Sequence, residues 1–410
     1  MPIPRALHEQ EDAGGAGTSC GLILTGGGAR AAYQVGVLAG VLQILDPART
    51  ARFKNPFDII SGTSAGAINA AAIACRAHDP HTAIDHMEAL WSNLHTGMVY
   101  HADTPRLLRT GLRWLSLLTL GWIMPKQASQ QPRSLLDNEP LGELLRATLD
   151  FSRLEANLES GLLKAVAVTA SAYTSGEHLT FYQSRSTIKP WRRSLRHAVP
   201  CAIGVDHLLA SSSIPFIFPA QAMLVHGQTV WCGDGSMRQL APLSPAIHLG
   251  AGKIFVIGTG HADDTYPEEK KLSPAYPTLA QIGGHTLSNI FLDSLSMDLE
   301  RLQRINELLA QLHPNALQSQ TLRRVRTLAI RPSRSLDDIA VKHLMQMPAA
   351  ARTLFRVLGV SSSSGPTTGG ALISYLLFES SYTQELIQLG RADSMNRIEE
   401  VKAFFKEAPQ

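Results

Sequence analysis

Residues 57–69 read FDIISGTSAGAIN and predict a buried strand, a tight turn and a helix in succession. The apolar start of this stretch is typical of a strand, and the alanine-rich run 65–75 is typical of a helix. Between them Ser64 is flanked by Gly62 and Gly66, and such small neighbours leave room for a strained turn that presents a hydroxyl. The pattern makes Ser64 a candidate nucleophile, with an ordinary glycine and serine turn as the alternative.

The composition narrows the class of protein. The chain has 410 residues, of which 44% are hydrophobic, enough for one large α/β domain with additions or for two domains. The formal charge is +3 and no long basic run appears, so nucleic acid is not an expected partner. The four cysteines are scattered, without a C-x-x-C pair or a cluster with histidine, which argues against a disulfide scaffold or a zinc site.

A glycine loop precedes the serine turn. Residues 21–24 predict a strand, residues 31–45 predict a helix, and Gly26, Gly27 and Gly28 lie between them. Successive glycines let backbone N–H groups form a concave nest that binds anions. Nucleotide binding is not expected, because the Lys-Ser/Thr pair of a P-loop and the glycine spacing of a dinucleotide-binding turn are both missing.

The loop can serve a nucleophilic serine, which needs an oxyanion site, a base and a pocket. The N–H groups of Gly27, Gly28 and Ala65 are the predicted oxyanion donors, and the cation of Arg30 can reinforce them. We favour this catalytic role for Arg30. The alternative is that Arg30 pairs with an acidic residue and only fixes the loop.

Two kinds of base are open. Asp234 lies in the turn CGDGS directly after a predicted strand, where flanking glycines such as Gly235 permit a turn that presents the carboxylate. The turn by itself favours an ordinary hairpin aspartate. A histidine is the other option, and His248 and His261 follow Asp234 in the chain order of α/β-hydrolases.

Three motifs, taken in order, resemble those of the bacterial patatin-like phospholipases. They are Gly-Gly-Gly-x-Arg at 26–30, Gly-x-Ser-x-Gly at 62–66 and Asp-Gly-Ser at 234–236. A small-residue loop that runs into Ile-Pro-Phe at 210–216 adds to the likeness, which covers about residues 21–260. The resemblance implies a Ser–Asp dyad without histidine, in which Ser64 is the nucleophile and Asp234 the base. It also implies an oxyanion hole at the glycine loop.

Two positions depart from the family pattern. Ala31 stands where the family often has glycine, and Ser236 stands where it often has glycine or alanine. Both residues are small, so we expect activity to survive, although Ser236 leaves the geometry of the aspartate turn open.

The fold implied is an α/β fold, a patatin-like three-layer α/β/α sandwich with a central, mostly parallel sheet and added helices. We expect residues 1–18 to be a disordered tail and residues 19–335 to form the hydrolase domain, with a helical insertion at about 95–135. Residues 336–410 are expected to form a C-terminal helical extension.

Several segments carry more specific expectations. Residues 104–124 combine leucine and tryptophan with three arginines, which is typical of an interfacial helix, with a helix that covers the core as the alternative. Residues 277–312 and 375–389 each predict one helix. The apolar loop 211–219 contains prolines that exclude regular helix and could line a pocket.

The predicted function is hydrolysis of carboxylic ester bonds in membrane lipids, of the phospholipase A or lysophospholipase type, through an acyl-Ser64 intermediate. The lipid substrate comes from the resemblance. A lipid acyltransferase and a catalytically silent membrane-associated protein of the same fold are the alternatives. No metal or cofactor is implied, and the expected partners are a lipid ester and a membrane surface.

The expected location is cytoplasmic, with peripheral binding to the inner face of the membrane. Residues 1–19 are polar and have no apolar signal core, and the apolar run within 104–124 is too short to span a bilayer.

Overall fold

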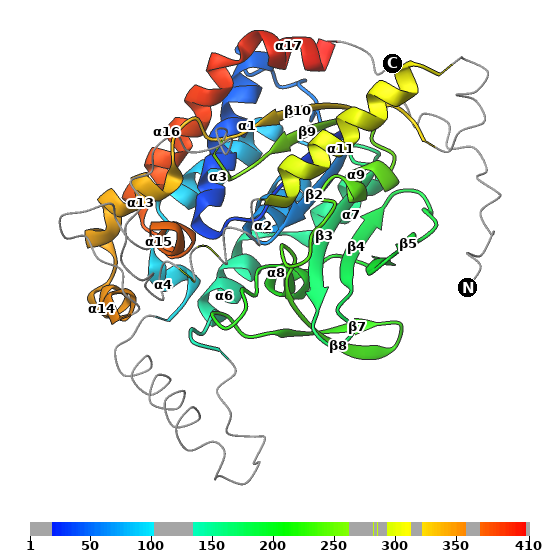
Figure 1. The fold of residues 1–410 in the computed structure, drawn as a ribbon. Helices are drawn as coiled ribbons and strands as arrows, with labels where there is room; N and C mark the ends of the chain where they lie inside the picture. Colours follow the sequence, from blue (N-terminus) through cyan, green and yellow to red (C-terminus); the bar gives the residue numbers. More distant parts are fainter. Residues whose placement is uncertain are drawn as a thin grey trace.

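The structure is a computed structural model that describes residues 19–101, 134–261, 282, 285, 293–312, 322–357 and 370–406. In this part of the chain a central sheet is covered by helices on both faces (Figure 1). The expected three-layer α/β/α architecture is therefore confirmed.

Five parallel strands form the centre of the sheet, in the order β10–β9–β1–β2–β3. Their bounds are Cys20–Leu24 (β1), Ile59–Thr63 (β2), Ala165–Ala172 (β3), Lys253–Ile257 (β9) and Arg326–Ile330 (β10). Leu24 of β1 is level with Gly62 of β2. Because the strands are parallel, the glycine loop after β1 and the serine turn after β2 leave the sheet at the same edge.

Mixed pairing, mostly antiparallel, extends the sheet beyond β3. The further strands are His178–Ser184 (β4), Arg192–Arg193 (β5), Arg196–Pro200 (β6), Gln221–Val225 (β7) and Gln228–Asp234 (β8). The last residues of β8 pair with β3, so that Asp234 lies opposite Ala170. This pairing brings the aspartate turn to the edge of the sheet where the serine turn also lies.

Both faces of the central strands are buried, because alternate side chains enter different cores. Leu22, Ile60, Val166 and Phe255 belong to the larger core, and Ile23, Ile59, Ala167 and Ile254 belong to the smaller one. In the part of the chain that the structure describes, the smaller core is covered by Ser244–His248 (α9) and Asp293–Ala310 (α11).

The larger core is shared with most of the other described helices. The first ones are the 3-10 turn Gly28–Ala31 (η1), Ala32–Leu45 (α1), Ala65–Cys75 (α2), Pro80–Ser92 (α3), Thr96–Val99 (α4), Glu139–Thr148 (α6), Phe151–Glu159 (α7) and Val205–Ser211 (α8). The later ones are Leu336–His343 (α13), Leu344–Gln346 (η3), Ala349–Val357 (α14), Gly370–Leu376 (α15), Ser380–Asn396 (α16) and Ile398–Lys406 (α17).

Helices α1 and α16 lie side by side although they come from opposite ends of the chain (Figure 1). At Gly36 a Cβ atom would lie only 2.0 Å from the carbonyl oxygen of Ile387, so only glycine permits this close approach. Helices α16 and α17, beyond residue 335, thus pack directly on α1. The domain boundary at 335 stays a prediction.

Among the described residues, one helix is long enough and apolar enough to cross a membrane. It is the stretch Gly28–Leu45, which comprises η1 and α1, and 89% of it is buried inside the fold. Its buried residues pack in the larger core, as expected for the central helix of an α/β domain.

Several sequence expectations need correction. The helix expected over 375–389 is divided between α15 and α16, and the backbone of Glu379 forms a β-bridge with His95 at the break. This tertiary contact leaves no mark in local periodicity. The short strands β5 and β6 and helix α7 were not expected at all.

Other expectations fall outside the described residues. They are the tail 1–18, most of the insertion 95–135, the helix 104–124 and the start of the helix 277–312. Within that last range, α11 begins at Asp293.

Candidate active site

Ser64 occupies a strained turn between β2 and α2. Its backbone has φ 54° and ψ −130°, a conformation that non-glycine residues rarely adopt and that costs on the order of 1–3 kcal/mol. A Cβ atom at Gly62 would lie 2.4 Å from the carbonyl oxygen of Gly66, and one at Gly66 would lie 2.4 Å from that of Leu24. The Gly-x-Ser-x-Gly spacing is thus required by close backbone packing around the turn.

The Ser64 hydroxyl donates a hydrogen bond to a carboxylate. Its Oγ lies 2.6 Å from Oδ2 of Asp234, although the two residues are far apart in sequence. Ser64 is 1% exposed and Asp234 is fully buried. Of the base candidates, Asp234 is therefore the one in contact with the serine.

Ser211 and Ser213, at the end of α8, support both members of this pair. Ser211 Oγ accepts the backbone N–H of Ser64 at 2.8 Å, and its carbonyl accepts that of Gly235 at 3.0 Å. The carbonyl of Ser213 accepts the N–H of Asp234 at 2.9 Å. The sequence predicted that this small-residue loop lines a pocket, but it did not predict these hydrogen bonds. They depend on tertiary pairing, and no local motif encodes them.

The Asp234 carboxylate has few polar contacts for a buried charge. Burial raises its pKa to about 6, although hydrogen bonds from Ser64 and from the backbone N–H of Ser236 lower it. Ser236 itself is buried at 3% exposure. A carboxylate with a raised pKa is a stronger base than an ordinary aspartate and is still mostly ionised at neutral pH.

The candidate histidines have other partners. His248 stacks on Trp191 with ring centroids 4.8 Å apart, and burial lowers its pKa to about 4. His261 Nδ1 lies 2.9 Å from the carbonyl of Pro332. A third histidine, His178, is buried and donates from Nε2 to the carbonyl of Gly235 at 2.9 Å. This bond to Gly235 stabilises the aspartate turn. The sequence did not indicate a role for His178.

The glycine loop lies at the same edge of the sheet and is buried. The Thr259 hydroxyl donates to the carbonyl of Gly26 at 2.6 Å, which fixes one peptide plane of the loop. Within the described part of the chain, no group accepts a hydrogen bond from the backbone N–H of Gly27, Gly28 or Ala65. Buried N–H groups are rarely left without an acceptor, so these three are suited to receive an acceptor from a ligand.

Arg30 makes the contacts expected if it pairs with an acidic residue and fixes the loop. Its guanidinium donates from Nη2 to Asp337 Oδ1 at 2.5 Å and from Nε to Ser374 Oγ at 2.8 Å. It also lies 3.9 Å from the ring centroid of Tyr375. All of these partners belong to α13 and α15, so Arg30 connects the glycine loop to the C-terminal helices.

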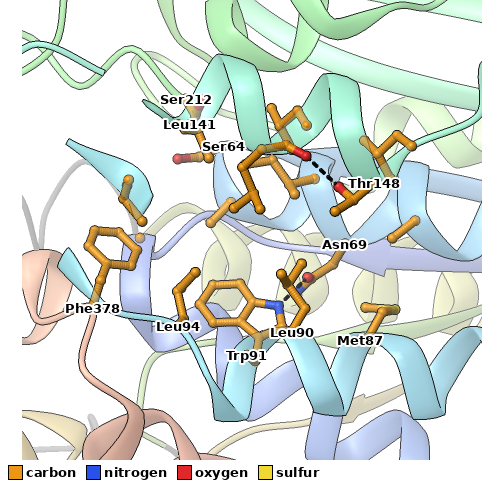
Figure 2. A pocket seen from close by; sticks show the side chains of 18 of the residues that line it. Ser64, Asn69, Met87, Leu90, Trp91, Leu94, Leu141, Thr148, Ser212 and Phe378 are labelled. Atoms are coloured by element: carbon orange, nitrogen blue, oxygen red, sulfur yellow. Dashed lines mark hydrogen bonds between the residues drawn. The ribbon is translucent and has the colours of Figure 1, made fainter. Parts of the chain in front are cut away.

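An apolar pocket opens beside Ser64 (Figure 2). It contains about 750 Å³ of empty space, open solvent included. Its walls come from α2, α3, α4, α6, the loop after α8 and Phe378. Three lining residues of the loop are Ser212, Ile214 and Phe218, which confirms the expectation that segment 211–219 lines a pocket.

The few polar side chains in the pocket are mostly satisfied. Trp91 donates from Nε1 to Asn69 Oδ1 at 2.9 Å, and Thr148 Oγ1 donates to the carbonyl of Leu144 at 2.7 Å (Figure 2). Asn69 in turn donates to the carbonyl of Ala31 and to Gln34. The pocket is therefore suited to a long apolar group, with the Ser64 hydroxyl beside it.

Comparison with known proteins assigns the family. The sequence model of the family described as Patatin-like phospholipase matches residues 22–247, more than half of the chain. The chain belongs to the patatin-like phospholipase family. The match covers the end of β1, the glycine loop, the serine turn and the aspartate turn, so the resemblance expected from the motifs is confirmed.

Two further comparisons add little to this patatin-like assignment. Among solved structures, VipD from Legionella pneumophila is similar at 14% sequence identity and a TM-score of 0.31, over 91% of this chain and 67% of that chain. A likeness this loose carries no weight for fold or function. Comparison with curated proteins gives no significant match.

Membership of the patatin-like family assigns the chain to the lipid acyl hydrolases in general, with lipids as the substrate class.

Among the described residues, one group could offer three ligand atoms to a metal ion, namely His101, Asp137 and Glu139. Both carboxylates are exposed, and exposed acidic groups commonly bind no ion.

Proposed function

We propose that the protein hydrolyses carboxylic ester bonds of membrane lipids, as a phospholipase A or lysophospholipase, with Ser64 as nucleophile and Asp234 as general base. The observation that supports this best is the 2.6 Å hydrogen bond between the two buried side chains beside an apolar pocket. A polar pair of this kind is costly inside a protein, and such costs are concentrated at functional sites.

The proposed reaction has two halves. Ser64 Oγ attacks the ester carbonyl carbon while Asp234 takes the hydroxyl proton, and the carbonyl oxygen becomes an oxyanion. The ester C–O bond then breaks, and the leaving alcohol takes the proton from Asp234. In the second half Asp234 removes a proton from water, which attacks the acyl-Ser64 carbonyl carbon. The bond between that carbon and Ser64 Oγ then breaks, Asp234 returns the proton to Oγ, and the fatty acid is released.

The proposed oxyanion hole consists of the glycine loop, Gly26 to Gly28, and the N–H of Ala65. The unbonded N–H groups of Gly27, Gly28 and Ala65 support this proposal. Removing one such donor typically costs about 10²–10³ in rate. We propose that Arg30 contributes to this site by fixing the position of the glycine loop, since its guanidinium is paired with Asp337.

The proposed acyl site is the apolar pocket. Ser64, Ile68 and Ala72 lie one turn apart and all line it, so it follows α2 for about 12 Å at 1.5 Å per residue. An extended acyl chain suits this shape, because each buried methylene contributes about 0.8 kcal/mol.

The proposed partners are a phospholipid or another lipid ester and, peripherally, a membrane surface. A cytoplasmic location also remains a prediction. The segment 104–124, the candidate for membrane contact, lies outside the described residues.

The test combines two substitutions. Ser64→Ala and Asp234→Asn should each lower kcat/KM by orders of magnitude on phospholipid vesicles, and the double variant should be no worse than either, because the two groups act as a unit. His248→Ala and His261→Ala serve as controls that should keep activity. A histidine variant as inactive as Ser64→Ala, with its fold preserved, would contradict the dyad.

Product analysis separates hydrolysis from acyl transfer. With glycerol or lysolipid added, a hydrolase releases free fatty acid, whereas a transacylase forms a new ester in its place. A catalytically silent binding protein would do neither.

A further inference from the structure

An ion pair with a buried guanidinium connects the glycine loop to the C-terminal helices. Arg30, which lies in η1 directly after the glycines, is 3% exposed, and its partner Asp337 is 35% exposed. The pair joins the glycine loop to the first turn of α13. Burying a guanidinium requires well-placed partners, because an unpaired buried charge is strongly unfavourable.

The rest of the Arg30 site comes from α15. Ser374 Oγ accepts from Arg30 Nε and lies 2.8 Å from the same Asp337 oxygen, so the three side chains form one closed set of contacts. The Tyr375 ring lies under the guanidinium, and both α15 residues are fully buried. Tyr382 then ties α13 to α15, because its hydroxyl lies within hydrogen-bonding distance of the carbonyls of Leu336 and Ser374.

The backbone of α15 also touches the loop itself. Gly28 has φ +55°, and a Cβ atom there would lie 2.2 Å from the carbonyl oxygen of Tyr375. The loop is therefore enclosed by Thr259 on the Gly26 carbonyl and by Tyr375 at Gly28.

These contacts bear on the reaction because three successive glycines have little conformational preference of their own. Donors in an oxyanion hole act only when they are already aimed at the position of the developing charge. The N–H groups of Gly27 and Gly28 thus need a constraint from outside the loop, and the contacts from α13 and α15 supply one.

We propose that α13 and α15 clamp the glycine loop in its reactive geometry, with Arg30, Asp337 and Ser374 as positioning residues for the oxyanion hole. The C-terminal helices, which lie beyond the matched family segment at 22–247, are then part of the active site. This inference rests on the proposed function, because it takes the loop to be the oxyanion hole.

The test compares two neighbouring aspartates in the full-length protein. Asp337→Asn removes the ionised partner of Arg30, whereas Asp338→Asn removes the same charge from an exposed position in the same turn of α13. On a soluble short-chain ester, Asp337→Asn should lower kcat roughly tenfold with KM unchanged, because a displaced donor is felt in the transition state. Asp338→Asn should match the wild type.

Two further variants separate positioning from folding. Ser374→Ala removes one hydroxyl and no charge, and it should lower kcat severalfold with the melting temperature close to that of the wild type. Asp337→Glu restores a carboxylate and should recover part of the kcat lost in Asp337→Asn. If the ion pair were purely structural, these substitutions would instead lower the melting temperature and leave the kcat of the folded fraction unchanged.

The inference is overturned if Asp337→Asn has normal kcat, or if its loss of rate follows the loss of folded protein. Ser64→Ala in the same assay distinguishes failure of the clamp from failure of the proposed function. If Ser64→Ala is inactive and Asp337→Asn is normal, only the clamp is wrong. If Ser64→Ala retains activity, the proposed function fails and the clamp fails with it.

Discussion

At the scale of single residues, an unfavourable contribution to stability comes from the buried carboxylate of Asp234. The carboxylate is fully buried, and desolvation raises its pKa from the ordinary value of 3.8 to about 6. Between these two pH values the folded protein binds more protons than the unfolded chain. The free energy of unfolding therefore falls as the pH rises through this window, and above it the ionised carboxylate destabilises the fold.

Replacement of this carboxylate should stabilise the protein at neutral pH. An asparagine side chain can keep its Oδ1 on the Ser236 N–H and donate from Nδ2 to Ser64 Oγ, and it carries no charge. Asp234→Asn should thus raise the free energy of unfolding at pH 8 by up to about 3 kcal/mol and leave it nearly unchanged at pH 4. Thermal melts at the two pH values measure this. Equal melting temperatures of the wild type and Asp234→Asn at pH 8 would contradict the conclusion that the ionised carboxylate destabilises the fold.

The same group should control the acid side of the activity profile. A base must be deprotonated to accept the Ser64 proton, so kcat/KM should fall tenfold per pH unit below an apparent pKa of about 6. Initial rates on a soluble ester between pH 4 and 8 give this profile. A flat profile down to pH 4 would exclude Asp234 as the base.

At the scale of elements, α2 sets the depth of the acyl pocket. Ala72 lies two turns beyond Ser64 and lines the pocket, so Ala72→Phe should shorten the space available to an acyl chain. Each methylene kept out loses about 0.8 kcal/mol, roughly fourfold in kcat/KM. The preferred chain should become shorter, while an acetyl ester, which never reaches Ala72, serves as the internal control. An unchanged chain-length preference would place the acyl group elsewhere.

The crossing of α1 and α16 makes a separate prediction about stability. Glycine to alanine in a helix normally stabilises by about 0.5–1 kcal/mol, and the exposed Gly97 of α4 should behave in this way. Gly36→Ala should instead destabilise by about 1–3 kcal/mol, because its Cβ would collide with Ile387. Denaturant titration of both variants measures the contrast, and similar effects from the two would argue against the close crossing.

The elements also show what the sequence could predict. The strands β1, β2 and β9 are short apolar runs bounded by glycine, and local pattern is sufficient to find them. The break between α15 and α16 depends on the contact between Glu379 and His95, and it has no local signal. Pairing across long sequence separations decides such features, and no single segment contains that information.

The site follows the same division. The serine turn, the glycine loop and Asp234 were predicted as candidates because each is a motif with its own glycines. The supporting contacts of Ser211 and His178 were not predicted, since each depends on a partner brought close only by the fold. An acidic partner of Arg30 was predicted as an alternative, but only the fold identifies it as Asp337.

At the scale of the whole molecule, the C-terminal helices should be inseparable from the rest. Tyr375, Tyr382, Leu386 and Phe404 lie beyond residue 335 and are at most 1% exposed. A chain ending at 335 would expose the surfaces they cover on α1 and the glycine loop. We expect this fragment to aggregate or to melt without cooperativity, in contrast to the full chain. A soluble fragment with a cooperative melt would instead support a domain boundary at 335.

The most direct test of the central claim is covalent labelling with an alkyl fluorophosphonate, followed by mapping of the modified peptide. We expect one adduct per chain, on Ser64, with no label in Ser64→Ala and much slower labelling in Asp234→Asn, because the hydroxyl then lacks its base. A stable adduct on another residue in an active preparation, or equal labelling of Ser64→Ala, would contradict the assignment of Ser64 as the nucleophile.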